Sequence, residues 1–251
     1  MPFANEQYYF EHGEAAPVRL PLILIHGAGG THLSWPPQLR RLPGWRVLAV
    51  DLPGHGRSPG KGRDSIREYA ECILGFLDVC GIDRAVLCGH SMGSAIALCL
   101  ALEHPQRVGG LALVGAGGRL RVNPEILARA AGENTYREAV RLVTAYSFSS
   151  RTSRRLVELA ERRMAESLQP VLYGDFLACD AFDVMDRVSE VKQRTLIVCG
   201  EDDQMTPLRY ARFLAEQMPE ARLEVVPGAG HMAMLEQPQR VNKLIIGFLD
   251  Q

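Results

Sequence analysis

A serine stands between two glycines in Gly89-His90-Ser91-Met92-Gly93. The apolar run before this segment, 85–88, predicts a buried strand, and residues 94–102 predict a helix. A serine at such a turn has strained backbone that lifts its hydroxyl above the sheet, and small residues two places away prevent clashes. The turn also puts the N–H of Met92 at a helix start, where negative charge is stabilised. The context favours Ser91 as a nucleophile over the alternative, an incidental serine in a glycine-rich turn.

A serine hydroxyl is a weak nucleophile and needs a base within hydrogen-bond reach. Where a strand–serine–helix turn carries the nucleophile, the acid and then the histidine follow it in the chain. Two histidines follow Ser91. His104 stands next to Pro105 at a predicted helix end, whereas His231 lies in a loop after the last predicted strand. Such a loop reaches the carboxyl edge of a parallel sheet, so His231 is the predicted base.

The acid should hold the tautomer of the histidine and stabilise its charged form. Asp202 and Asp203 follow the predicted strand that ends at Cys199, again at the carboxyl edge. The rival position, after the strand 111–114, reads Gly-Ala-Gly-Gly and offers no carboxylate. The residues alone leave the choice between Asp202 and Asp203 open.

A glycine-rich loop, His26-Gly27-Ala28-Gly29-Gly30, follows the first long predicted strand. Its glycines allow backbone to approach a ligand closely, so we expect the N–H of Ala28 to form an oxyanion hole with that of Met92. Each such donor contributes about 3 kcal/mol of transition-state stabilisation. His26 is predicted to be structural, and so are His55 and Arg57 in the turn-rich segment that follows the strand 47–50.

Composition and charge disfavour several classes of function. The 251 residues carry a net charge of -1, which gives no reason to expect a nucleic-acid or membrane partner. The N-terminal residues lack the features of a signal peptide, and no apolar run approaches the roughly 20 residues that span a bilayer. The six cysteines show no metal-ligand spacing. We therefore expect a reduced, cytoplasmic protein without metal or cofactor, either monomeric or homodimeric.

Short apolar runs recur along the chain and alternate with helical patterns. Near-continuous apolar strands indicate burial on both faces, and hence a parallel sheet between layers of helices. A further run, 8–11, is predicted to be an edge strand that leads into a hairpin at Gly13. Residues 65–79 keep a 3.6-residue apolar rhythm typical of a helix. The predicted buried strands are 22–25, 47–50, 85–88, 111–114, 196–199 and 223–226.

One interval, 119–190, separates two predicted strands and contains none of its own. Unstructured loops beyond about 12–15 residues are uncommon in compact domains, so this segment is predicted to be an organised helical cap. The core domain then comprises residues 1–118 and 191–251.

With these residues in hand, the chain resembles the α/β-hydrolase superfamily, and most closely its small bacterial esterases, lactonases and haloperoxidase-like members with a cap. The resemblance implies an α/β-hydrolase fold with an eight-stranded, mostly parallel sheet and a lid inserted after strand six. It also favours Asp203 over Asp202, because the family acid is usually the third residue after the glycine of its Gly-x-x-Asp block. The segments that match are 26–30, 51–58, 89–93, 200–207 and 230–231.

The chain also departs from some relatives. Haloalkane dehalogenases and epoxide hydrolases of the superfamily carry aspartate at the position of Ser91, so those reactions are disfavoured. The carbon–carbon bond hydrolases of aromatic degradation typically carry Asn before the serine and Trp after the histidine. Here those positions hold His90 and Met232, so that function is a minority alternative. Some hormone receptors and bacterial stress regulators of this fold keep a triad, which leaves a slow-turnover receptor as a second alternative.

The cap is expected to select the substrate. Tyr146, Phe148 and Phe176 are the predicted substrate-binding residues, although packing inside the cap explains them equally well. Arginines outnumber glutamates between Arg119 and Pro170, and solvated helix faces account for that excess better than attraction of an anionic substrate. The sequence therefore predicts hydrolysis of a small apolar carboxylic ester, lactone or thioester through an acyl-enzyme on Ser91.

Overall fold

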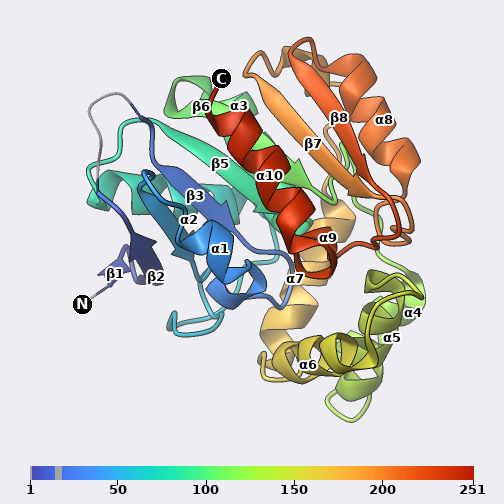
Figure 1. Ribbon diagram of the computed structural model, residues 1–251. Helices are drawn as coiled ribbons and strands as arrows, with labels where there is room; N and C mark the ends of the chain where they lie inside the picture. The colour runs from blue at the N-terminus through green and yellow to red at the C-terminus, as the bar shows by residue number, and fades with distance from the viewer. Residues whose placement is uncertain (1, 15–18) are drawn as a thin grey trace.

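The computed structural model describes residues 2–14 and 19–251. Eight strands form one sheet in the order β1-β2-β4-β3-β5-β6-β7-β8, and helices cover both faces (Figure 1). β3 to β8 run parallel, while β2 pairs antiparallel with both β1 and β4. The strands are β1 (Phe3–Ala4), β2 (Gln7–His12), β3 (Leu22–Ile25), β4 (Val47–Val50), β5 (Ala85–His90), β6 (Val108–Val114), β7 (Thr195–Gly200) and β8 (Ala221–Val226).

The helices alternate with the strands as the apolar pattern predicts. The α-helices of the core are α1 (Pro37–Arg40), α2 (Ile66–Val79), α3 (Met92–Glu103), α8 (Leu208–Gln217), α9 (Ala233–Glu236) and α10 (Pro238–Leu249). Those of the insert are α4 (Pro124–Ala131), α5 (Tyr136–Ser147), α6 (Arg154–Met164) and α7 (Gln169–Ala181). The 3₁₀ turns are η1 (His32–Ser34), η2 (Pro105–Arg107) and η3 (Val188–Glu190).

All six predicted buried strands are present, and two of them, β3 and β4, have the predicted bounds. The prediction that 8–11 forms an edge strand is wrong, because β1 lies outside β2 at the edge of the sheet. On its inner side β2 pairs with β4, and β4 lies between β2 and β3. The hairpin partner of β2 is β1, through a turn at Asn5 and Glu6, which both have positive φ. The hairpin predicted at Gly13 would extend into residues 15–18, which lie outside the described residues.

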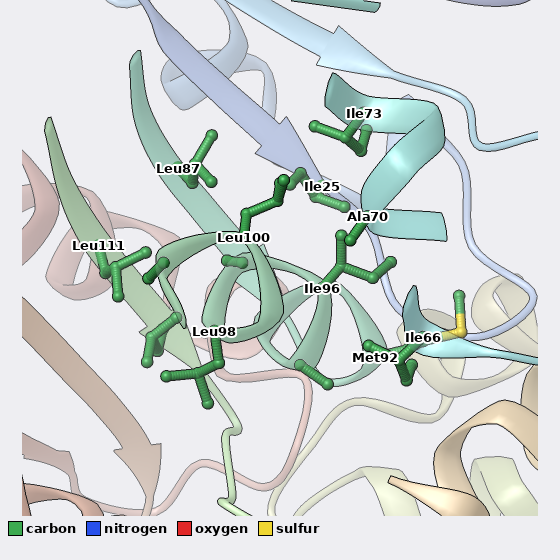
Figure 2. Packing of buried hydrophobic residues seen from close by; sticks show 14 of the residues in the cluster. Ile25, Ile66, Ala70, Ile73, Leu87, Met92, Ile96, Leu98, Leu100 and Leu111 are labelled. Carbon is green, nitrogen blue, oxygen red and sulfur yellow. The ribbon is translucent and has the colours of Figure 1, made fainter. Parts of the chain in front are cut away.

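Two apolar clusters lie on opposite faces of the sheet. One contains side chains of α2, α3 and α8, and the other contains side chains of α1, α9 and α10. Figure 2 shows the first of these, where Ile96 and Leu100 of α3 lie among side chains of β3, β5 and α2. α3 is buried along most of its length, so its N-terminus, which carries Ser91, is held rigidly against the sheet.

The helical insert α4–α7 follows β6, as predicted, and projects beyond one end of the sheet (Figure 1). Its own apolar cluster joins α4 and α5 to Leu172 and Phe176 of α7. Ala178 and Cys179, further along α7, pack into the core cluster instead. α7 therefore anchors the insert, called the cap below, on the domain.

Among the residues that the structure describes, none of the helices combines the length and the apolar character that crossing a bilayer requires.

Candidate active site

Ser91 occupies a sharp turn between β5 and α3. Its φ of 52° and ψ of -117° are strained for a residue with a side chain. A Cβ on Gly89 would lie 2.2 Å from the carbonyl oxygen of Gly93, and a Cβ on Gly93 would lie 2.2 Å from that of Ile25. Only glycine fits at either place, which explains the spacing seen in the sequence.

The peptide between Ser91 and Met92 is fixed by the start of α3. The carbonyl oxygen of Ser91 accepts hydrogen bonds from the N–H groups of Ser94 (2.8 Å) and Ala95 (3.2 Å) and from the hydroxyl of Ser94. Because carbonyl and N–H of one trans peptide point in opposite directions, the N–H of Met92 points out of the helix N-terminus. The Met92 side chain lies in the core (Figure 2), so only its backbone N–H is available for chemistry.

His231 and Asp203 meet at the same edge of the sheet. Nδ1 of His231 donates to Oδ2 of Asp203 at 2.9 Å, and both side chains are buried. Nε2 is thereby left as the nitrogen that can take a proton from a nucleophile. Ser91 and His231 line one cavity, although within the described part of the chain no hydrogen bond joins the hydroxyl to Nε2. Such contacts are often loose before a substrate binds.

The carboxylate of Asp203 is held by several donors. The N–H groups of Met205 (2.9 Å) and Thr206 (2.8 Å) bind Oδ1, and the hydroxyl of Thr206 binds Oδ2 at 2.8 Å. Burial alone would raise the pKa of Asp203, but the charge and hydrogen bonds of His231 and these donors lower it below its usual value. Asp203 is therefore an ionised partner for an imidazolium.

Asp202 has a different partner. Its Oδ2 accepts a hydrogen bond from the hydroxyl of Ser149, in the loop between α5 and α6, at 2.6 Å. Glu236 contacts the same loop: its carboxylate accepts the N–H of Ser149 (2.9 Å) and that of Gly230 (2.8 Å), the residue before His231. Asp202 and Glu236 thus connect the cap to the loops that carry Asp203 and His231.

The loop 26–30 turns back on itself beside Ser91. The carbonyl oxygen of Gly27 accepts from the N–H of Gly30 at 3.0 Å and from Nδ1 of His26 at 2.8 Å. This carbonyl shares a peptide plane with the N–H of Ala28, so both bonds fix the direction of that N–H. Within the described residues the N–H groups of Ala28 and Met92 have no hydrogen-bond acceptor. Both are free to stabilise an oxyanion.

His26 and His90 are buried neutral histidines beside the site. Nε2 of His26 accepts the N–H of Leu52 at 3.0 Å, so its proton is on Nδ1, toward Gly27. Burial and then the charge of His55 lower its pKa to about 4. Nε2 of His90 donates to the carbonyl of His231 at 3.1 Å, and burial followed by His231 lowers the pKa of His90 to about 3. Both rings hold backbone rather than move protons.

A cavity of about 870 Å³ lies between the cap and the core. Ser91, His231 and Ala28 line it from the core, and Phe148 and Phe176 line it from the cap. Tyr146 does not appear in its lining and packs against the cap's apolar cluster instead. Other apolar lining residues are Val143, Leu156, Leu159 and Met164. The space above Ser91 is therefore largely apolar and roomy enough for a small organic molecule.

The sequence pattern missed Asp175 and Glu236, two acidic residues that fix backbone near the site. Asp175 stands on the buried face of α7, one helical turn from Leu172 and Cys179. A carboxylate on such an apolar face was the available signal, because buried acids are almost always paired. Glu236 lies on the four-residue helix α9, and no pattern in the sequence marks it.

Residues 21–238 match the family model described as alpha/beta hydrolase fold. A 2-hydroxy-6-oxo-6-phenylhexa-2,4-dienoate hydrolase from Burkholderia cepacia is 32% identical over 250 residues, covering 91% of this chain and 87% of the relative. A solved thermophilic esterase is 32% identical, with a TM-score of 0.84 over 97% of this chain and 93% of the other. Est816, an N-acyl homoserine lactone degrading enzyme, is 29% identical, with a TM-score of 0.82 over 96% of each chain.

Proposed function

The chain belongs to the α/β-hydrolase fold family, and on that premise we propose that it is a serine hydrolase that cleaves a small carboxylic ester or lactone through an acyl-enzyme. The observation that carries the proposal is the shared cavity: strained Ser91 and the Asp203-bound imidazole of His231 line the same space. Similarity to an esterase and to a lactone-degrading enzyme supports this substrate class. A cytoplasmic location, favoured by six free thiols, belongs to the same proposal.

In the proposed reaction, Oγ of Ser91 attacks the carbonyl carbon of the ester while Nε2 of His231 takes the hydroxyl proton. Ionised Asp203 stabilises the imidazolium that results. The N–H groups of Ala28 and Met92 bind the oxyanion, and the imidazolium protonates the leaving alkoxide. Water then repeats the sequence on the acyl-enzyme and releases the acid. No step requires a metal or a cofactor.

Hydrolysis of a carbon–carbon bond is a second candidate, because curated relatives at 32% identity are named for it. Two residues argue against it: His90 and Met232 stand where those enzymes typically carry Asn and Trp. Nε2 of His90 also donates its proton to the carbonyl of His231, so this proton is not available to a substrate. The ester function is therefore preferred.

The test is turnover of p-nitrophenyl esters from acetate to decanoate, beside a 2-hydroxy-6-oxo-dienoate whose loss is followed by absorbance. Steady turnover of short esters, abolished in Ser91→Ala, is the expected result. Cleavage of the dienoate with kcat/KM well above that of every ester would transfer the proposal to the carbon–carbon function. Labelling of Ser91 by a fluorophosphonate together with a single turnover per molecule would indicate a receptor.

A further inference from the structure

Gly29, the residue after Ala28, is held by the cap through both of its backbone polar groups. Its N–H donates to Oδ2 of Asp175 at 2.8 Å, and its carbonyl accepts the hydroxyl of Ser167 at 3.1 Å. Its φ is +61°, and a Cβ there would lie 2.8 Å from Leu172 and 3.3 Å from Met164. All four contacts come from the cap. The cap therefore packs directly on the loop that carries Ala28.

Successive peptide planes of this loop are each fixed by a separate partner. The plane with the Ala28 N–H is held by His26 through the carbonyl of Gly27. The next plane carries the N–H of Gly29 and is held by Asp175. The two planes share the Cα of Ala28, so a displacement of the second plane shifts that atom and with it the first plane. The bond from Gly29 to Asp175 therefore restrains Ala28 from its other side, in addition to the bonds that His26 and Gly30 make to the carbonyl of Gly27.

The carboxylate of Asp175 also binds two side chains of the core, one at each oxygen. Its Oδ1 accepts the hydroxyl of Tyr69 at 2.6 Å, and its Oδ2 accepts Nε2 of His55 at 2.8 Å in addition to Gly29. The side chain is fully buried, and Asp175 does not line the described cavity. It therefore acts on the site through the backbone that it holds and not by contact with the substrate.

We infer that Asp175 is a positioning residue for the oxyanion hole: a cap carboxylate that aims the N–H of Ala28 by fixing Gly29, with Ser167 supporting the same residue. The inference rests on the proposed function of Ser91 and of the Ala28 N–H. It makes the cap a structural part of the catalytic site as well as the roof of the cavity.

The experiment compares Asp175→Ala with wild type on p-nitrophenyl butyrate. A displacement of about 1 Å at a reacting group costs about 10²-fold in rate, so we expect kcat to fall by about that factor with KM nearly unchanged. The inhibition constant of an alkyl trifluoromethyl ketone, whose adduct carries an oxyanion, should rise by a similar factor. Loss of a residue that only stabilises the fold would not raise this inhibition constant while leaving KM unchanged.

Tyr69→Phe is the matched control, because it removes a hydrogen bond from Oδ1 only and leaves His55 to hold the oxygen, Oδ2, that binds Gly29. It should lower the melting temperature while leaving kcat within about threefold of wild type. Ser167→Ala, a half-buried position, keeps the inference testable where Asp175→Ala does not fold. It should lower kcat about fivefold with KM and melting temperature nearly unchanged.

Failure of the inference is separable from failure of the proposed function. Inactive Ser91→Ala together with wild-type kcat in Asp175→Ala would overturn the positioning role alone. A loss of kcat in Tyr69→Phe as large as that in Asp175→Ala would also overturn it. If Asp175→Ala does not fold, an unchanged kcat in Ser167→Ala would do the same. Full activity of Ser91→Ala would instead overturn the proposed function.

Discussion

Asp202 and Asp203 are neighbours in the chain, yet their carboxylates bind different parts of the molecule. Asp203 accepts Nδ1 of His231 at 2.9 Å, whereas Asp202 accepts the hydroxyl of Ser149 in the cap at 2.6 Å. Two adjacent residues thus have different roles: Asp203 binds the imidazole, and Asp202 binds the cap.

The two aspartates should therefore respond differently to the same substitution. Asp203→Asn places an amide N–H against Nδ1 of His231 and favours the wrong tautomer, so we expect kcat to fall about 10⁴-fold. Asp202→Asn keeps an oxygen for Ser149 and should leave kcat within about threefold. Ester turnover by both purified variants checks this, and a reversed order would assign the acid to Asp202.

Ser91→Ala should remove the nucleophile without disturbing the fold. The helix N-terminus is held by backbone hydrogen bonds and by Ser94, none of which needs the Ser91 hydroxyl. We expect kcat to fall by about 10⁴–10⁶ with an unchanged melting temperature. Turnover above a tenth of wild type, in protein free of contaminating esterase, would contradict the assignment of Ser91.

Acyl-chain preference should depend on Phe148. Phe148 lines the cavity and is 6% exposed, so Phe148→Ala enlarges the space above Ser91. We expect the optimum to move to longer p-nitrophenyl esters, with several-fold lower kcat/KM on acetate, because a lost apolar contact costs about 1–3 kcal/mol. Tyr146→Ala is the matched control, since Tyr146 is absent from the cavity lining. An equal shift in both variants would mean that cap stability, not cavity shape, sets the preference.

The fold could be predicted from the sequence wherever the signal was local. Buried parallel strands such as β3 and β4 are continuous apolar runs, and the turn at Ser91 needs glycines at fixed spacing, so both are visible in the chain itself. The pairing of β2 was not predictable in this way. Strand pairing depends on packing between segments that are distant in the chain, and a local apolar run does not indicate which strand will lie beside it.

The same distinction applies to the site. Order along the chain pointed to His231 and to a pair of aspartates, but the partner of each carboxylate depends on three-dimensional contacts. The contact between the cap and the loop 26–30 was even harder to predict from the sequence. Gly29 and Asp175 are 146 residues apart, and their hydrogen bond exists only because α7 packs back on the core.

The buried pair His55 and Asp175 should make stability fall at alkaline pH. The ring of His55 lies between two acceptors, the carbonyl of Pro53 at 3.0 Å and the carboxylate of Asp175 at 2.8 Å. An imidazole that donates from both nitrogens is charged. Burial alone would lower the pKa of His55, but the charge and hydrogen bond of Asp175 outweigh it and raise the pKa above 6.5.

A raised pKa in the folded state sets the sign of the effect. The stabilisation from His55 is fully present below its unfolded pKa of about 6.5 and is lost as pH rises through the folded pKa. The other titratable groups that face the ring do not change charge in this range. Tyr69 has a raised pKa and stays neutral, His26 titrates at about 4, and the pKa of Asp51 is lowered.

His55→Gln tests this directly, because glutamine offers Asp175 a donor that cannot titrate. At pH 6 the variant should be less stable than wild type by about 3 kcal/mol, the loss expected when one partner of a buried ion pair is removed. The difference should narrow steadily up to pH 9.5, measured as urea midpoints. His104→Gln, which alters a surface histidine beside Glu71, should leave the profile of wild type unchanged. A gap between wild type and His55→Gln that stays constant with pH would show that the ring is neutral in the folded protein.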